Sequence, residues 1–302
     1  MNIVETTELS KIYGGKAAVN GVSMHIPEGS IYGFVGENGS GKTTIMRLLT
    51  GLATPSKGSF TLFGVKNNEM KIYAARKQIS AIVEATSLVP SMTAIDNIIY
   101  QENYLGVKLK KEERMELLKI VHLDQTGKKK VKNFSLGMRQ RLGIAMALMN
   151  KPKLMLLDEP LNGLDPQGIA ELRDLLIEIN KNEGITILIS SHILSELEKI
   201  ATTYGFISHG RLIEEVTVDE LQNRCRKSTT INVEDVKKAE EVITKEGIKE
   251  YKAFPNGDII VYDDIDIGEF ISNLYKNKIK IHTVNSSDES VEEYYLNLVK
   301  GE

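Results

Sequence analysis

Cysteine and aromatic residues are scarce in this sequence. Its 302 residues include one cysteine and no tryptophan, and aromatic residues make up 6% of the total. The single cysteine, Cys225, has no second cysteine with which to form an internal disulfide. This is typical of a reducing compartment and argues against a secreted, disulfide-stabilised scaffold.

An excess of charge of either sign is also missing. Lys and Arg number 38 against 41 Asp and Glu, which leaves a formal net charge of -3. Nucleic-acid-binding chains commonly carry a strong basic field, and this chain has none overall. We therefore expect no nucleic-acid partner, although composition alone does not exclude one.

Long hydrophobic runs are absent as well. A bilayer-spanning helix needs about 18 or more successive apolar residues, and the longest runs, Leu154–Leu157 and Ile185–Ile189, are far shorter. Met1–Tyr13 alternates apolar residues with glutamates, which argues against a signal peptide. The short runs instead predict strands buried on both faces, as in a parallel sheet covered by helices.

The order of these runs predicts an α/β domain followed by a smaller one. Since a domain typically has about 150 residues, 302 residues predict two. The first shows strand and helix alternation, with a mostly helical insert at about residues 93–150, and this pattern predicts a doubly wound layer. The expected strands are Ile3–Leu9, Val22–Ile26, Ile31–Val35, Lys153–Leu157, Ile185–Ser190 and Leu212–Val216, and the expected helices include Thr43–Leu49, Gln167–Asn182 and Val218–Cys225.

Beyond residue 225 the sequence predicts a small α+β domain. The polar stretch Arg226–Thr229 is interpreted as a linker. After it, the expected order is strand, helix, two strands joined by a Pro255–Gly257 turn, helix and strand, which is a ferredoxin-like arrangement, and a final helix follows. The expected elements are Thr230–Val233, Val236–Glu246, Glu250–Phe254, Asp258–Val261, Ile267–Asn277, Lys280–Thr283 and Ser290–Val299.

A phosphate-binding loop is the clearest local motif. Gly36–Thr43 matches G-x-x-x-x-G-K-[ST] between a hydrophobic strand and a helix, which is the context that this motif requires. Its glycines let backbone amides surround a phosphate, Lys42 would reach the β- and γ-phosphates, and Thr43 would bind Mg²⁺. A merely flexible glycine loop is the alternative, which the flanking strand and helix disfavour. The candidate nucleotide-binding residues are Gly36, Glu37, Asn38, Gly39, Ser40, Gly41, Lys42, Thr43 and Thr44.

Two carboxylates and a histidine follow buried strands. Asp158 would hold the metal at the carboxyl edge of the sheet, and Glu159 would orient and deprotonate an attacking water. His192 follows the next strand to the same edge and would donate to the γ-phosphate. Alone, the Asp-Glu pair is equally consistent with a helix cap, and the histidine with an ordinary surface residue. Together with the phosphate loop, Glu159, His192 and Lys42 are the candidate catalytic residues.

Residues 134–141 add a sequence that resembles one family. Phe134-Ser-Leu-Gly-Met-Arg-Gln-Arg141 resembles the LSGGQ signature of the nucleotide-binding subunits of ATP-binding cassette (ABC) transporters, and the likeness covers about residues 1–225. Without the family, Ser135 is interpreted as the N-cap of a helix over Met138–Asn150. The resemblance implies that Ser135 and Gly137 contact nucleotide and that Tyr13 stacks on adenine, although Tyr13 alone is also consistent with a half-buried strand aromatic. Leu161–Asp165 resembles the family's D-loop.

The sequence departs from the family pattern at two places. Leu136 and Met138 stand where the signature usually has Gly and Gln, and Glu84 stands where the Q-loop usually has Gln. A carboxylate at this position can ligate Mg²⁺, but it adds negative charge near the triphosphate. These departures and the extra C-terminal domain are similar to the bacitracin-resistance and lantibiotic-immunity branch of peptide-antibiotic exporters.

The resemblance implies a specific architecture and activity. We expect a P-loop ABC ATPase cassette over residues 1–225, with a mixed sheet core, and a ferredoxin-like domain over 229–302 that acts as a packing module, ligand sensor or dimer brace. Two copies would sandwich ATP, with Mg²⁺ held by Thr43, Asp158 and Glu84, and hydrolysis would power export of a peptide antibiotic or similar amphipathic compound. A separate transmembrane permease subunit would hold the chain, itself cytoplasmic, peripherally on the inner face of the cell membrane.

Two other functions use the same phosphate loop. A non-transport ABC ATPase acting on nucleic acid or ribosomes generally has a long inserted coiled coil or two cassettes, and the interval from Thr43 to Ser135 shows no sustained heptads. A small-molecule kinase leaves the signature and His192 unexplained. The sequence therefore favours a transporter ATPase, with the non-transport ATPase as the alternative.

Overall fold

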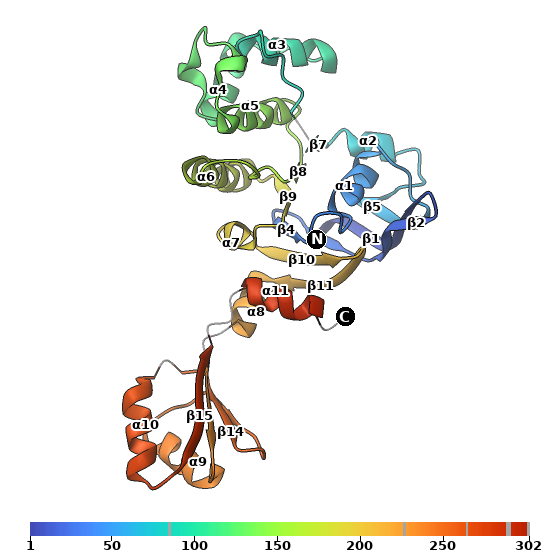
Figure 1. Ribbon diagram of the computed structural model, residues 1–302. Coiled ribbons are helices and arrows are strands. Elements are labelled where there is room, and N and C mark those ends of the chain that lie inside the picture. The colour runs from blue at the N-terminus through green and yellow to red at the C-terminus, as the bar shows by residue number, and fades with distance from the viewer. Residues whose placement is uncertain (84–85, 226–227, 264, 288–290, 301–302) are drawn as a thin grey trace. The chain divides into compact units, whose positions relative to one another are not determined.

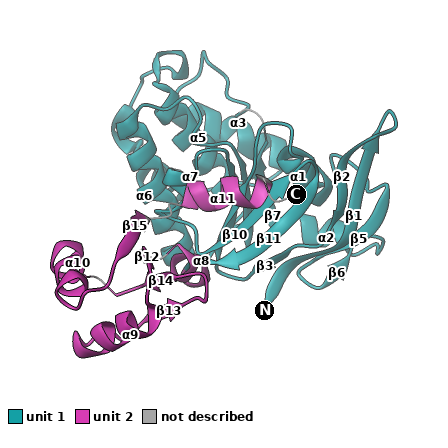
Figure 2. Cartoon of the chain, turned by 60° about the horizontal axis from the view of Figure 1, so that its bottom comes forward, with its two compact units in different colours: residues 1–218 teal, residues 219–302 magenta. Residues whose placement is uncertain are grey.

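The computed structural model describes residues 1–83, 86–225, 228–263, 265–287 and 291–300. By the contacts within it, the chain divides into two compact units, Met1–Val218 and Asp219–Glu302 (Figure 2). Glu84 and two residues of the predicted linker, Arg226 and Lys227, lie outside the described residues.

A mixed sheet forms the centre of the first unit (Figure 1). Its strand order is β11-β10-β4-β9-β8-β7, and β11 pairs antiparallel with β10 at one edge while the others pair in parallel. The inner strands are apolar runs buried on both faces, so the predicted parallel layer is confirmed. The strands are β4 (Ile31–Val35), β7 (Ile79–Ile82), β8 (Leu154–Asp158), β9 (Thr186–Ser191), β10 (Thr203–Ser208) and β11 (Arg211–Thr217).

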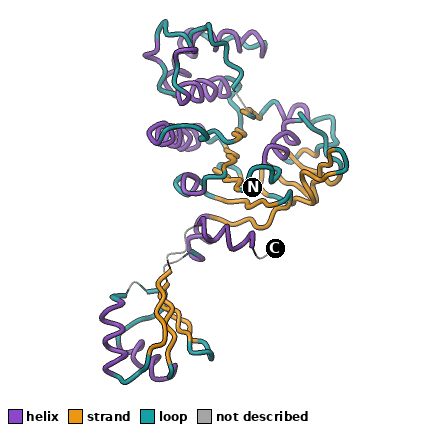
Figure 3. Tube along the Cα trace, viewed as in Figure 1, coloured by secondary structure: helices purple, strands orange, loops and turns teal. Residues whose placement is uncertain are grey.

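Helices connect these strands and form the predicted helical insert (Figure 3). The helix α1 follows β4 directly, α6 links β8 to β9, and α3 to α5 lie between β7 and β8. The parallel pairing of neighbouring strands requires such crossovers, which bring the carboxyl ends of β4, β8 and β9 to one edge. The helices are α1 (Lys42–Thr50), α2 (Ile72–Arg76), α3 (Ala94–Leu105), α4 (Lys111–Ile120), η1 (Asp124–Thr126), η2 (Val131–Asn133), α5 (Leu136–Leu148), α6 (Pro166–Glu183) and α7 (Leu194–Leu197). The next helix, α8 (Val218–Arg224), begins at the last residue of this unit and otherwise belongs to the second.

The same unit contains a second, antiparallel sheet. One predicted strand differs from the strands observed in it. The expected strand Val22–Ile26 is wrong, because β2 ends at Val22 and a separate strand, β3, begins at His25. The two pair with β1 on different stretches, so the chain must break between them. The strands are β1 (Asn2–Tyr13), β2 (Lys16–Val22), β3 (His25–Pro27), β5 (Lys57–Leu62) and β6 (Val65–Lys66).

Tyr32 joins the strand before the phosphate loop to the edge of the sheet. Its ring is fully buried in β4, and its hydroxyl donates to Glu215 Oε1 of β11 at 2.8 Å. Burial, then the charge of Glu215, raises the pKa of Tyr32 well above its ordinary value, so the phenol stays a donor. The ring occupies the place that a side chain at Gly205 would fill, which explains the glycine there.

We expect Tyr32→Phe to lower the free energy of unfolding by about 1–2 kcal/mol, because the partly buried Glu215 carboxylate loses a hydrogen-bond donor. Urea unfolding at neutral pH measures this change. Tyr73→Phe removes a hydroxyl from a side chain that is 66% exposed and serves as the control. Equal midpoints for the two variants would contradict a stabilising role for the Tyr32 hydroxyl.

The second unit has the predicted ferredoxin-like order. Its sheet runs β13-β14-β12-β15 with all pairs antiparallel, so the first and third strands of the unit are central. Its apolar core lies between the sheet and helices α9 and α10. The linker prediction is wrong at Ser228 and Thr229, which begin β12. The elements are β12 (Ser228–Val233), α9 (Val236–Lys245), β13 (Tyr251–Ala253), β14 (Asp258–Val261), α10 (Ile267–Lys276), β15 (Ile281–Ser287) and α11 (Val291–Lys300).

Candidate nucleotide-binding site

The phosphate loop lies between β4 and α1, as its motif predicts. Gly41 has φ 111°, and a Cβ there would lie 2.6 Å from the Ala18 carbonyl oxygen, so only glycine fits this turn. A cavity of about 150 Å³ opens at the loop, lined by Ala18 and Glu159 together with the loop and first-turn residues Asn38, Gly39, Gly41, Lys42, Thr43 and Thr44. Ser40 Oγ, in the same loop but not on the cavity wall, is buried without a hydrogen-bond partner. The cavity surrounded by loop residues gives the loop the shape expected of an anion cradle.

Lys42 folds back into the loop. Its side chain is 5% exposed, and its ammonium donates to the carbonyl oxygens of Gly36 at 2.6 Å and Glu37 at 3.1 Å. Glu159 Oε1 lies 3.2 Å from the same nitrogen. The buried charge is thereby compensated at the place where the motif expects phosphate oxygens.

Asp158 connects the end of β8 to α1. Thr43 Oγ1 donates to Asp158 Oδ2 at 2.6 Å, which joins the two residues that the sequence assigns to the metal. The other oxygen, Asp158 Oδ1, accepts from Ser190 Oγ, also at 2.6 Å. Hydroxyl and carboxylate oxygens are the ligands that Mg²⁺ prefers, so these two residues fit the expected ion.

Sequence reasoning missed Ser190. It is fully buried at the end of β9, and besides the bond to Asp158 it accepts from the backbone N–H of Glu159 at 2.9 Å. One signal was available: a serine ends the otherwise apolar run Ile187–Ile189, two residues before His192. A buried hydroxyl needs partners, and the carboxyl edge of the sheet supplies them.

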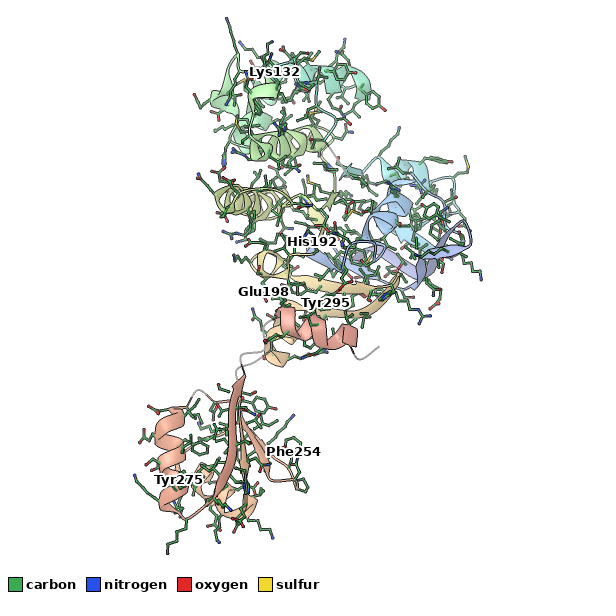
Figure 4. The ribbon with its side chains drawn as sticks, viewed as in Figure 1. Lys132, His192, Glu198, Phe254, Tyr275 and Tyr295 are labelled. Atoms are coloured by element: carbon green, nitrogen blue, oxygen red, sulfur yellow. The ribbon has the colours of Figure 1, made fainter. Side chains whose placement is uncertain are left out.

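Glu159 lies between two basic side chains. Its Oε2 is 2.8 Å from His192 Nδ1, and its Oε1 faces Lys42. Figure 4 labels His192, which lies where the chain passes from β9 to α7. Glu159 has φ 49°, a conformation that residues other than glycine seldom adopt and that often marks functional sites. The structure thus brings Lys42, Glu159 and His192 into one chain of contacts.

The signature residues lie on the helical insert, away from the phosphate loop in sequence. Ser135 caps α5, with its Oγ accepting from the Met138 backbone N–H at 3.2 Å, as predicted. Gly137 lies in the first turn of that helix, where backbone amides have no helical partner. A groove of about 800 Å³ is lined by Leu136 and Arg139 of α5 and also by Asp158 and Glu159.

Tyr13 ends β1, and the residue is 46% exposed. Lys11 Nζ lies 4.9 Å from the ring centroid, a cation–π contact on this exposed aromatic. The ring is therefore accessible for stacking on a base. Glu84, the third expected metal ligand, lies outside the described residues.

Comparison with known proteins identifies the family. A family model described as ABC transporter matches residues 19–162. The bacitracin transport ATP-binding protein BcrA of Bacillus licheniformis is 40% identical over 301 residues, covering 99% of this chain and 98% of the relative. The chain belongs to the ABC transporter ATP-binding family. BcrA of Enterococcus faecalis is 38% identical over 300 residues, which cover 99% of this chain and 97% of the relative. This ABC protein therefore shares both of its units with the two BcrA relatives.

Other relatives are similar over a smaller share of the chain. The lantibiotic transport ATP-binding protein SrtF of Streptococcus pyogenes is 44% identical over 221 residues, which covers 73% of this chain and 93% of the relative. The solved cbiO1 cassette from Clostridium perfringens, part of the ABC transporter complex cbiONQ, is 27% identical with TM-score 0.65, covering 74% of this chain and 91% of that one. The dimeric post-hydrolysis cassette MJ0796, bound to ADP and Pi, is 25% identical with a TM-score of 0.62. The match covers 71% of this chain and 98% of that one.

Family membership sets the activity. ABC ATPases bind and hydrolyse ATP, and this chain is an ATP-hydrolysing subunit of a transporter. Among the helices within the described residues, none has both the length and the apolar character to span a bilayer.

Proposed function

We propose that this ABC ATPase powers export of a peptide antibiotic through a separate membrane subunit, with Glu159 as the general base. The contact chain Lys42–Glu159–His192 supports the catalytic part, because it places a carboxylate beside the phosphate loop. The names of the BcrA and SrtF relatives, which specify bacitracin and lantibiotic transport, support the cargo.

The residues at the loop fit a magnesium nucleotide. Backbone amides of Gly36–Thr43 and the Lys42 ammonium would bind the phosphates, and the exposed Tyr13 ring would stack on the adenine. Thr43 Oγ1 and Asp158, already 2.6 Å apart, would hold Mg²⁺, which supplies neutralisation of charge on the β- and γ-phosphates. We keep Glu84 as a proposed third ligand on the basis of its place in the sequence.

Glu159 and His192 would share the work of hydrolysis. The Glu159 carboxylate would orient a water and accept its proton, and binding of phosphates would compete for Lys42 and release Glu159 from that ion pair. His192 Nδ1 contacts Glu159 Oε2 at 2.8 Å, and a ring protonated on both nitrogens would donate from Nδ1 to this carboxylate and from Nε2 to a γ-phosphate oxygen.

We propose that two copies close around the nucleotide. The first turn of α5, capped by Ser135 and containing Gly137, would contact the γ-phosphate bound to the partner copy, because its free amides form an anion site. ATP would favour the closed dimer, since only that state makes both sets of phosphate contacts. The dimeric MJ0796 cassette with ADP and Pi supports this arrangement in a related protein.

A groove in the first unit suits a helix of the membrane subunit. It has a volume of about 280 Å³ and lies between β7, α3 and α5, with Gln101 on one wall and Ala147 on the other. Binding there would hold the ATPase on the cytoplasmic face of the cell membrane. The alternative, an ABC ATPase acting on nucleic acid or ribosomes, is not favoured by any of the transport proteins that the comparisons name.

Co-expression with a candidate polytopic membrane protein, sought in the neighbouring reading frames, tests the proposal. We expect the two to purify together in detergent without nucleic acid, and Gln101→Trp to reduce the recovered complex about tenfold, because an indole would fill the groove. Tyr104→Trp is the matched control on α3, where the side chain is 80% exposed and outside the groove. Recovery of nucleic acid in place of a membrane protein would refute the transport function.

A further inference from the structure

The hydroxyl of Ser190 occupies the centre of a hydrogen-bonded junction. It donates to Asp158 Oδ1 at 2.6 Å and accepts from the Glu159 backbone N–H at 2.9 Å. Ser190 is fully buried, so water does not substitute for either partner. One side chain on β9 therefore contacts both residues of the Asp-Glu pair at the end of β8.

The strand register explains this position. Asp158 and Ser190 form the last pair of the ladder between β8 and β9. The next residue, Glu159, turns into the left-handed region at φ 49°, so its N–H leaves the regular ladder. A hydroxyl has one proton to donate and two lone pairs. Ser190 donates its hydroxyl proton to the Asp158 carboxylate and accepts the freed Glu159 N–H with a lone pair.

The carboxylate of Asp158 is consequently held from both sides. Thr43 Oγ1 donates to Oδ2, and Ser190 Oγ donates to Oδ1, each at 2.6 Å. Two donors on opposite oxygens fix the rotation of the carboxylate plane. Hydrogen bonds behind a metal ligand commonly set ligand orientation and change metal affinity or activity by about 10–100-fold.

We propose that Ser190 is a positioning residue that aligns Asp158 for Mg²⁺ and, through the Glu159 backbone, aligns the general base. The proposal rests on the metal and base roles given above. Ser190 would act through its bonds to Asp158 and the Glu159 backbone, and we assign it no direct contact in the reaction. Its hydroxyl links the Asp158 carboxylate to the Glu159 backbone, so the metal ligand and the residue that carries the base are held together.

The test compares Ser190→Thr with Ser190→Val in the full-length chain, because the two side chains have the same shape and differ in the hydroxyl. Calorimetry measures ATP affinity with Mg²⁺ and with EDTA, and steady-state assays measure kcat. In Ser190→Val we expect the gain in ATP affinity that Mg²⁺ provides to fall by about 10–100-fold, and kcat to fall by a similar factor. ATP affinity in EDTA should not change. Ser190→Thr should keep all three values.

Thr186→Val is the matched control. Thr186 is fully buried at the other end of β9, and its hydroxyl accepts from the Gly29 N–H at 2.8 Å. This variant also deletes a buried hydroxyl bond on the same strand, and we expect its Mg²⁺ dependence to match the unmodified protein. If neither β-branched variant at 190 folds, Ser190→Ala replaces the Val variant and the unmodified protein replaces the Thr variant.

The results of these assays distinguish failure of the Ser190 positioning role from failure of the proposed Mg²⁺ site. Equal Mg²⁺ dependence of Ser190→Val and Ser190→Thr, or an equal loss in Thr186→Val, would overturn the positioning role and leave the nucleotide site intact. Absence of any Mg²⁺-dependent ATP binding by the unmodified protein would instead overturn the proposed metal site. A loss specific to the variant without a hydroxyl at 190 would support the positioning role.

Discussion

Replacing Glu159 with glutamine is expected to slow ATP hydrolysis by about 100- to 10,000-fold, the range that a positioned general base contributes. The amide has nearly the same shape but cannot accept the water proton. ATP binding should persist, because Thr43, Asp158 and the loop amides are unchanged. Lys42 also loses its ion pair at 3.2 Å, so its ammonium is more available to phosphate.

Phosphate-release assays and size-exclusion chromatography with Mg-ATP measure the two consequences. We expect slow turnover together with a dimer that persists, since ATP stays in place as the contact between copies. Glu178→Gln removes the same charge at an exposed position on α6 and should behave as the unmodified protein. Unchanged turnover, or a variant that elutes only as a monomer, would remove Glu159 from the role of base.

Replacing Lys42 with alanine is expected to abolish detectable nucleotide binding. The ammonium is buried within the phosphate loop, where charge-assisted bonds to phosphate are strong. We expect affinity to fall by about 100-fold or more, equivalent to about 2.8 kcal/mol. The loss should be similar for ATP and ADP, because Lys42 would contact the β-phosphate as well as the γ-phosphate.

Calorimetric titration with Mg-ATP measures this loss, and thermal unfolding without nucleotide checks that the variant is folded. Lys108→Ala removes an exposed lysine from the connection between α3 and α4 and is the control. Wild-type affinity in a folded Lys42→Ala protein would refute the phosphate-binding role of the loop.

Local motifs were predictable because their information is contiguous. Gly36–Thr43 requires only a strand before it and a helix after it, and both are present. Ser135 was predicted as a helix cap from its place before a helical pattern, and the cap is confirmed. The order of the second unit followed from alternating strands and helices with a short turn at Pro255–Gly257.

Contacts between distant segments were not predictable in the same way. Lys42 and Glu159 are 117 positions apart in the sequence (159 minus 42), and Ser190 meets Asp158 only because β8 and β9 pair in parallel with a defined register. The strand Lys16–Val22 was missed because its burial pattern lacks a regular alternation, and its pairing with β1 contains register shifts. Such irregularities depend on the partner strand, which periodicity does not report.

The backbone at Glu159 has a consequence for how this ATPase can change over evolution. A residue with a Cβ in the left-handed region is strained by about 1 kcal/mol or more, and glycine would relieve it. The same substitution would also remove the ion pair with buried Lys42, so strain and charge pairing act in opposite directions on stability at this position. With Glu159 as the proposed base, a library screened only for folding would not select for the catalytic carboxylate, and variants at position 159 would have to be screened for turnover as well.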